Sequence, residues 1–153
     1  MRVAVLAIGR QKNGPEAALV ADRLGRFDAT GRALGLGPAT LREIEDRKRV
    51  GESRLLLDAL PDDAYAVALD ERGATMGSRD FAALLARLRD EGRRDCAFLI
   101  GGADGHSEEL RGRADLLLGF GKMVWPHMLA RAMLAEQLYR AASILAGSPY
   151  HRD

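Results

Sequence analysis

Short apolar runs alternate with amphipathic segments along the whole chain, and each run has about the length of a β-strand. RVAVLAI at 2–8, YAVALD at 65–70 and CAFLI at 96–100 are each followed within a few residues by glycine. Apolar runs of this length with such boundaries predict strands. CAFLI is almost entirely apolar, which indicates a strand that is buried on both faces of a sheet. Two weaker runs, TLREI at 40–44 and DLLLGF at 115–120, are predicted as further strands.

The segments between these runs have the period of α-helices. Within EAALVADRLGRF, for example, Val20, Leu24 and Phe27 fall on one stripe. Ser78 is predicted as an N-cap and Gly92 as the residue that ends the same helix. Helices are predicted over 16–27, 47–60 and 78–91, in a short acidic stretch from Ser107, and from the first turn at Pro126 to about Ala146.

Strand and helix alternate five times, without repeats, linkers or low-complexity tracts. This order predicts a single α/β domain over residues 1–153, with a mostly parallel sheet of five to six strands and helices on both faces. In such sheets ligands bind beyond the carboxyl ends of the strands. The residues expected at a site are therefore Leu69 to Gly73, Gly101 to His106 and Phe120 to His127.

Composition agrees with one folded domain and limits the function. The chain has 153 residues, 47% of them apolar and 29% charged, and it lacks the roughly 18 to 20 apolar residues in a row that a membrane span needs. The one cysteine, Cys96, lies in an apolar strand and is expected to be an inert buried thiol, which fits a reducing cytoplasm.

The basic residues are unusual because twenty are arginines and three are lysines, Lys12, Lys48 and Lys122. Arginine suits bidentate phosphate contacts, although genomic base composition explains such a bias equally well. The net charge is only +1, so any binding of RNA must come from local patches of charge.

The last predicted helix is apolar on more than one side, with Glu136 and Arg140 forming an i,i+4 pair on its narrow polar side. A helix of this kind is buried on two sides. We expect one side to pack on the sheet and the other on a second subunit, in a two-fold homodimer. The apolar positions are Met128, Leu129, Met133, Leu134, Leu138, Ile144 and Leu145.

Gly101, Gly102 and Gly105 form the pattern G-G-x-x-G after a buried strand. This is neither a dinucleotide fingerprint nor a phosphate-binding loop. Carboxylates at Asp104, Glu108 and Glu109 further disfavour an anion at this place, which argues against a phosphorylated cofactor. The glycines and carboxylates favour a nucleoside or a cationic ligand, and a tight turn with acidic helix capping is the alternative.

Two further segments contain aromatic and basic side chains that are candidates for binding or catalysis. The loop GKMVWPHM at 121–128 holds the only tryptophan, Trp125, which is either a packing anchor or a surface for stacking a ligand. The chain ends in SPYHRD, where Tyr150, His151 and Arg152 follow one another, although termini are usually bland.

These segments carry a resemblance to a known family. FLIGGADG, KMVWPHMLARAMLAEQLYRAASILAG and SPYHR resemble the RlmH family of SPOUT-class methyltransferases, which act on a pseudouridine in helix 69 of large-subunit (23S) ribosomal RNA. The likeness is strongest over residues 96 to 152 and collinear with the whole chain. It implies a C-terminal trefoil knot, an obligate homodimer, and S-adenosyl-L-methionine held in the knot crevice. We expect the protein in the cytoplasm and expect no metal ion at its site. The RNA substrate is expected within the large subunit or the ribosome.

The resemblance also assigns roles by position. The departures from the family pattern are Phe120-Gly121 and Val124 in the knotted loop, and Ser148 near the end of the chain. A cofactor contact that needs a Ser or Thr hydroxyl would be missing there. The cofactor contacts are expected at Leu69, Gly101, Gly102, Phe120, Gly121, Lys122, Met123, Val124 and Trp125.

Methylation at N3 of pseudouridine requires removal of the imide proton, and we assign this role to His151, or to water that it orients. Arg152 and Arg140 would bind RNA phosphate or base carbonyls, while Tyr150 would stack on the base or hydrogen-bond to it. Nearby carboxylates would favour a cationic methyl donor, and the candidates are Asp70, Asp104 and Glu108.

The tail of one subunit is expected to complete the site of the other. The competing hypothesis is a non-catalytic RNA- or ribosome-associated α/β module that retains the fold.

Overall fold

Five parallel strands form one sheet in the order β2-β1-β4-β3-β5, and this confirms the predicted α/β architecture. The computed structural model describes residues 1–152. The strands are β1 (Arg2–Ile8), β2 (Ala39–Ile44), β3 (Tyr65–Ala74), β4 (Asp95–Ile100) and β5 (Leu116–Leu118). The helices are α1 (Pro15–Gly31), α2 (Glu52–Ala59), α3 (Ser78–Asp90), α4 (Glu108–Arg113) and α5 (His127–Leu145), with a short 3₁₀ turn at Arg32–Leu34.

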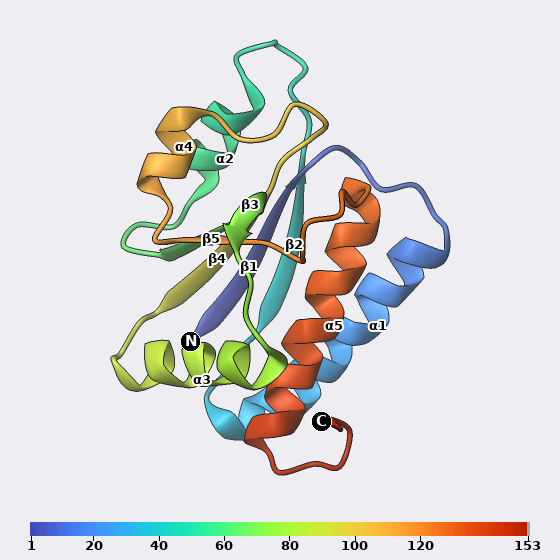
Figure 1. Cartoon of the computed structure of the whole chain (residues 1–153), viewed down its shortest axis with the longest axis vertical. Coiled ribbons are helices and arrows are strands. Elements are labelled where there is room, and N and C mark those ends of the chain that lie inside the picture. Colours follow the sequence, from blue (N-terminus) through green and yellow to red (C-terminus); the bar gives the residue numbers. More distant parts are fainter. Residues whose placement is uncertain (153) are drawn as a thin grey trace.

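Helices cover both faces of the sheet (Figure 1). Alternate residues of β4 enter two separate cores: Phe98 packs with α1, α3 and α5, while Leu99 packs with α2 and α4. All six residues of β4 are buried, as its apolar sequence predicted. Burial raises the pKa of the Cys96 thiol to about 12, so this cysteine is unreactive, as expected.

Helix α5 lies between α1 and α3 on one face of the sheet. Figure 1 shows α1 and α5 side by side, and Arg23 of α1 forms an ion pair with Glu136 of α5 at 2.6 Å. The second buried side of α5 is therefore covered by α1 of the same chain. The prediction that this side of α5 packs on a second subunit is wrong, because α1 occupies it. The homodimer itself stays a prediction.

Three local predictions need correction. Helix α2 begins at Glu52 rather than near residue 47, because Asp46 binds the amides of Val50 and Gly51 in a non-helical turn. Ser78 does not cap α3; its hydroxyl donates to Gln137 Oε1 at 2.7 Å. Pro126 is the N-cap of α5 and not a residue of its first turn.

Other helix ends agree with the sequence. Ser107 accepts a hydrogen bond from the Leu110 amide and caps α4. Gly92 follows α3 with φ +83° and the Arg93 amide binds the Leu88 carbonyl, which is the expected glycine termination.

Strands β3 and β5 approach one another very closely where β3 ends. Leu118 of β5 pairs with both Leu69 and Ala74 of β3. The residues of β3 between Leu69 and Ala74 therefore bulge out at the carboxyl end of the sheet. A Cβ at Gly73 would lie 2.6 Å from the backbone of Leu117, and only glycine permits this crossing. The trefoil knot implied by the resemblance stays a prediction.

Within residues 1–152, no helix is long and apolar enough to cross a membrane. The same part of the chain contains no group of three or more His, Cys, Asp or Glu side chains arranged to hold a metal ion.

Candidate functional site

A cavity of about 670 Å³ opens at the carboxyl ends of β3, β4 and β5. This is the edge of the sheet at which the alternation of strands and helices predicted a site, because the carboxyl ends of parallel strands meet there. Volumes of about 300 to 1,000 Å³ hold most small-molecule ligands. The walls come from segments 69–72, 100–106 and 118–127, together with Ala130 of α5.

The structure brings together nearly all of the residues predicted to hold a cofactor. Lys122 is the exception, since it is exposed and does not line the cavity. Their role in binding is a prediction that the geometry permits. The lining residues from that set are Leu69, Gly101, Gly102, Phe120, Gly121, Met123, Val124 and Trp125.

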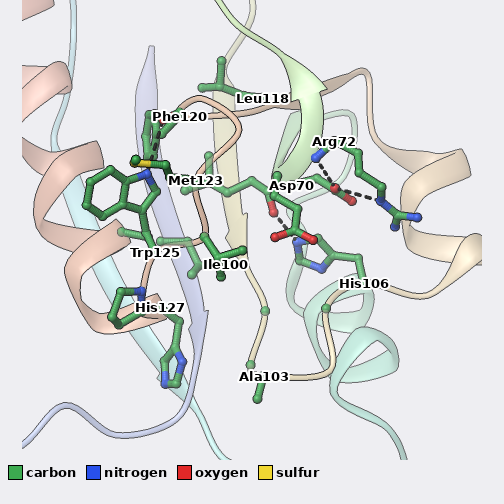
Figure 2. A pocket seen from close by; sticks show the side chains of 18 of the residues that line it. Asp70, Arg72, Ile100, Ala103, His106, Leu118, Phe120, Met123, Trp125 and His127 are labelled. Atoms are coloured by element: carbon green, nitrogen blue, oxygen red, sulfur yellow. Dashed lines mark hydrogen bonds and ion pairs between the residues drawn. The ribbon is translucent and has the colours of Figure 1, made fainter.

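One side of the cavity is apolar and open (Figure 2). Met123 and Val124 are 73% and 77% exposed, and Trp125 is 40% exposed. The Trp125 indole N–H donates to the Phe120 carbonyl at 3.3 Å, which folds the loop back on itself. Trp125 is therefore only partly a packing residue, and part of its side chain is accessible in the cavity wall.

The opposite side carries Asp70, whose side chain is only 6% exposed. It forms ion pairs with Arg72 at 3.4 Å and Arg111 at 3.3 Å, and Figure 2 shows it beside Arg72 and His106. Burial alone would raise the pKa of Asp70, but the hydrogen bonds from Arg72 and the charge of Arg111 outweigh it and lower this pKa. The carboxylate is thus ionised and its charge is already compensated.

The other two candidate carboxylates differ in position. Asp104 lines the cavity, whereas the Glu108 side chain is 96% exposed and lies outside the lining. Among the carboxylates proposed for a cationic donor, Asp70 and Asp104 remain at the site and Glu108 does not.

His106 supports the backbone at the centre of the cavity. Its Nε2 donates to the Leu69 carbonyl at 3.0 Å, and its Nδ1 is buried without a hydrogen-bond partner among residues 1–152. Burial lowers the pKa of His106, so the ring is neutral at pH 7. The sequence placed His106 in the site loop but gave no signal for this contact, because Leu69 lies 37 residues away.

Gly102 lets the start of α2 approach this loop. A Cβ at Gly102 would lie 2.8 Å from a carboxylate oxygen of Glu52, and the Ser107 amide donates to Ser53 Oγ at 2.9 Å. The loop after β4 is therefore fixed from outside the cavity by α2.

A second group of predicted residues gathers around α5 and is called the tail cluster: Glu136, Tyr139, Arg140, Tyr150 and His151. Tyr150 Oη donates to Glu136 Oε1 at 2.8 Å, and Arg140 donates to the same oxygen at 2.8 Å. Arg140 also donates to His151 Nδ1 at 3.2 Å and stacks 4.7 Å from the centre of the Tyr150 ring. The Tyr139 and Tyr150 rings lie 4.6 Å apart.

Arg140, Tyr150 and His151 thus lie together, as a functional group would require, but they do not line the cavity. Arg140 lies ten residues further along α5 than Ala130, a lining residue of the cavity, which is a rise of about 15 Å. Arg152 is exposed. The tail cluster does not complete the cavity of its own chain.

Sequence reasoning found Glu136 only as an ion-pair partner of Arg140, and it missed Arg23. Burial alone would raise the pKa of Glu136, but hydrogen bonds from Arg23, Tyr150 and Arg140 lower it. Burial and the Glu136 carboxylate raise the pKa of Tyr150. Glu136 also lines a second cavity of about 420 Å³ that shares Leu118, Phe120 and Gly121 with the first.

Comparison with known proteins identifies the family. Residues 1–151 match the family described as "Predicted SPOUT methyltransferase". The chain is 60% identical to "Ribosomal RNA large subunit methyltransferase H" of Ruegeria pomeroyi, with 99% of each chain covered. It is 59% identical to the protein of that name from Roseobacter denitrificans, with 100% of each covered.

Among solved structures, a probable methylase family protein from Haemophilus influenzae Rd KW20 covers 99% of this chain and 70% of its own, at 12% identity and a TM-score of 0.49. The assignment of the family therefore rests on the match over residues 1–151 and on the sequence relatives. Full-length matches of this identity show that the chain is a member of the ribosomal RNA large subunit methyltransferase H (RlmH) family of SPOUT methyltransferases.

Proposed function

We propose that this protein transfers a methyl group from S-adenosyl-L-methionine to N3 of a pseudouridine in helix 69 of 23S ribosomal RNA. The observation that carries the proposal is the cavity at the carboxyl edge, whose walls contain every predicted cofactor residue except Lys122. Relatives that are about 60% identical over their full length bear the name of a ribosomal RNA methyltransferase. We place the reaction in the cytoplasm, on the large subunit or the ribosome.

The residues present fit this cofactor. The two glycines Gly101 and Gly102 leave backbone exposed to a ligand, and Leu69, Phe120 and Trp125 offer apolar surface to an adenine ring. When bound, S-adenosyl-L-methionine would supply an electrophilic methyl group. The departures at Gly121 and Val124 leave the cavity open, so contacts there would come from backbone groups rather than from hydroxyls.

The tail cluster would act on the RNA base. An imide nitrogen keeps its proton at neutral pH, so N3 must lose it before it attacks. We assign this step to His151, with Arg140 and Arg152 binding base carbonyls or phosphate and Tyr150 stacking on the base.

The geometry of Arg140 adds a condition to this assignment. An arginine side chain only donates hydrogen bonds, so the Nδ1 lone pair of His151 is occupied by Arg140 at 3.2 Å. His151 can accept a proton at Nδ1 only after Arg140 moves away. Engagement of Arg140 by the RNA would free that lone pair at the moment when it is needed.

We further propose that two chains share each site. Arg140 of the tail cluster lies about 15 Å along α5 from the lining residue Ala130, and Met123, Val124 and Trp125 leave apolar surface exposed at the cavity mouth. A second copy of the chain that placed its tail over this mouth would cover the apolar surface and supply His151.

The decisive test of function is the modification state of helix 69. Mass spectrometry of 23S ribosomal RNA from a strain without this protein should show loss of one methyl group on a pseudouridine, and the purified protein should restore it in vitro. An unchanged helix 69 would refute the substrate. RNA binding without methyl transfer would favour the non-catalytic module instead.

Binding of the cofactor has a direct readout, because Trp125 is the only tryptophan and lies in the cavity wall. Its fluorescence should respond to S-adenosyl-L-methionine or to the demethylated product in a saturable titration. A chain cut after Pro149 should show the same titration but no methyl transfer. Full activity of that truncated chain would exclude the tail from catalysis.

Sharing of the site between two chains is tested by complementation. The truncated chain keeps an intact cavity, while a Gly101→Val chain keeps an intact tail but places a branched side chain in the cavity wall, where its Cβ would lie 3.2 Å from the His106 ring and 3.4 Å from the Gly105 carbonyl oxygen. Each alone should be inactive, and a mixture should recover part of the activity through mixed dimers. A mixture as inactive as its components, in chains shown to associate by sedimentation, would exclude the shared site.

A further inference from the structure

The three lysines of the chain all lie in loops at the same edge of the sheet as the cavity. Lys12 lies between β1 and α1, Lys48 between β2 and α2, and Lys122 between β5 and α5. Because all five strands are parallel, the loops that follow them share one edge. All three side chains are exposed.

Arginines increase the positive charge of two of these loops, 9–14 and 45–51, which we call the basic edge. Arg10 and Arg47 have side chains that are 75% and 77% exposed. Both are paired with Glu45, Arg10 at 3.9 Å and Arg47 at 3.1 Å. The loops hold five cations and two carboxylates: Arg10, Lys12, Arg47, Lys48 and Arg49 against Glu45 and Asp46.

The cations of the basic edge are largely uncompensated. No hydrogen bond or ion pair joins Lys12, Lys48 or Arg49 to another side chain within residues 1–152. Within residues 1–152 Asp46 forms no ion pair with these three residues, and its two oxygens accept the amides of Val50 and Gly51 at 2.9 and 2.8 Å. Exposed lysines without partners are suited to contact phosphate groups as point charges.

The backbone of the basic edge is held in place. The Gln11 amide donates to the Glu43 carboxylate, which forms an ion pair with the buried Arg131 at 2.7 Å. Arg131 also donates to the carbonyls of Ile8 and Gly9 at 2.8 and 2.7 Å. The basic side chains therefore project from a fixed base, which reduces the entropy lost when they bind.

Both loops border the cavity. Loop 45–51 leads into Glu52, whose carboxylate touches Gly102 of the cavity wall. Loop 9–14 begins at Gly9, which lies against Met128 at the start of α5, next to the lining residue His127. Figure 1 shows both loops at the end of the sheet that carries the start of α5.

We propose that the basic edge binds backbone phosphates of the ribosomal RNA on either side of the nucleotide that enters the cavity. The proposal rests on the proposed function and adds the surface that positions the substrate. The net charge of the chain is only +1, so long-range attraction is weak and a local cluster must supply the phosphate contacts. The acidic residues Asp104 and Glu109 lie on the neighbouring loop and helix, which confines the attractive surface to the basic edge.

The test is a pair of matched double variants. Lys12→Gln/Lys48→Gln removes two charges at the basic edge. Arg32→Gln/Arg94→Gln removes two exposed charges at the opposite end of the sheet, before β2 and β4. Binding to purified large ribosomal subunits and to 23S ribosomal RNA is measured between about 50 and 200 mM salt, because the affinity of phosphate contacts falls steeply over this range.

The lysine variant should bind at least about tenfold more weakly at low salt. The slope of log K against log salt concentration should fall by roughly 1.4 to 1.8, as expected for the loss of two phosphate contacts. The arginine variant should match the wild type in both measurements. Cofactor titration through Trp125 should be equal in all three proteins, because neither pair of residues lines the cavity.

Two outcomes overturn the proposal: an unchanged salt slope in the lysine variant, or an equal loss in both variants. Its failure is distinguishable from failure of the proposed function. If methyl transfer to helix 69 is present but insensitive to Lys12 and Lys48, only the basic edge is refuted. If methyl transfer is absent while the lysine variant still loses its salt slope, the basic edge stands as an RNA-binding surface and the reaction is refuted.

Discussion

Tyr150 donates its hydroxyl hydrogen to the carboxylate of Glu136 at 2.8 Å, across 14 residues of chain. The same carboxylate accepts from Arg140 at 2.8 Å and from Arg23 at 2.6 Å. Three donors from α1, α5 and the tail thus meet at one side chain. Glu136 therefore holds Tyr150 of the tail against α5 of the same chain.

Replacing Glu136 by Gln should lower the pKa of Tyr150. Burial and the neighbouring carboxylate both raise this pKa, so removing the negative charge should move it toward the ordinary value of about 10. The measurement is the absorbance of tyrosinate during an alkaline titration, with the Tyr150→Phe protein subtracted to remove the other two tyrosines. Methyl transfer should fall by about tenfold or more with unchanged cofactor affinity. A Tyr150 titration equal to that of the wild type would contradict this role for Glu136.

Replacing Arg131 by Met should lower the free energy of unfolding by about 3 kcal/mol. Arg131 is 1% exposed and binds the carbonyls of Ile8 and Gly9 as well as Glu43, so its loss leaves buried acceptors unpaired. Urea denaturation measures the effect. Arg54→Ala is the control, because its ion pairs with Asp58 and Glu109 are exposed and should each be worth less than about 1 kcal/mol. Similar losses in both variants would contradict the prediction.

Stability should decrease through His106 as the pH falls below about 6.5. Burial lowers the pKa of His106 in the folded protein, while the unfolded chain titrates near the ordinary value of about 6.5. Below that pH the unfolded state binds the proton more readily than the folded state, so the contribution to stability is complete above about pH 6.5 and is lost as the pH falls. His106→Gln should flatten this part of the stability curve in urea denaturation at several pH values. An unchanged slope in the variant would show that other groups are responsible.

Gly73→Ala should destabilise the fold by about 3 kcal/mol, in the range of an overpacked core. The new Cβ would lie 2.6 Å from backbone atoms of Leu117, and no flexible side chain can move aside. Gly112→Ala is the matched control, because its Cβ meets nothing within 4 Å on the helix α4. That substitution should stabilise by about 0.5 to 1 kcal/mol. Thermal unfolding of the two variants should therefore shift in opposite directions.

Much of the fold and the place of the site could be read from local pattern. The apolar run at 96–100 predicted a strand buried on both faces, and Gly92 predicted the end of α3. The three cavity loops were predicted because each follows a strand in the alternating pattern, and the carboxyl ends of parallel strands meet at one edge. Periodicity, caps and breakers are properties of neighbouring residues, and so the sequence carries them directly.

Tertiary structure decided the contacts between distant residues. The apolar sides of α5 did not reveal that α1 covers one of them, and the i,i+4 spacing that linked Glu136 to Arg140 gave no sign of Arg23, 113 residues away. Arg131, a charged residue in an apolar helix, is buried because the ends of β1 and β2 offer it two carbonyls and a carboxylate. A charge is stable inside a protein only when such partners surround it, and which partners surround it depends on packing in three dimensions rather than on spacing along the chain.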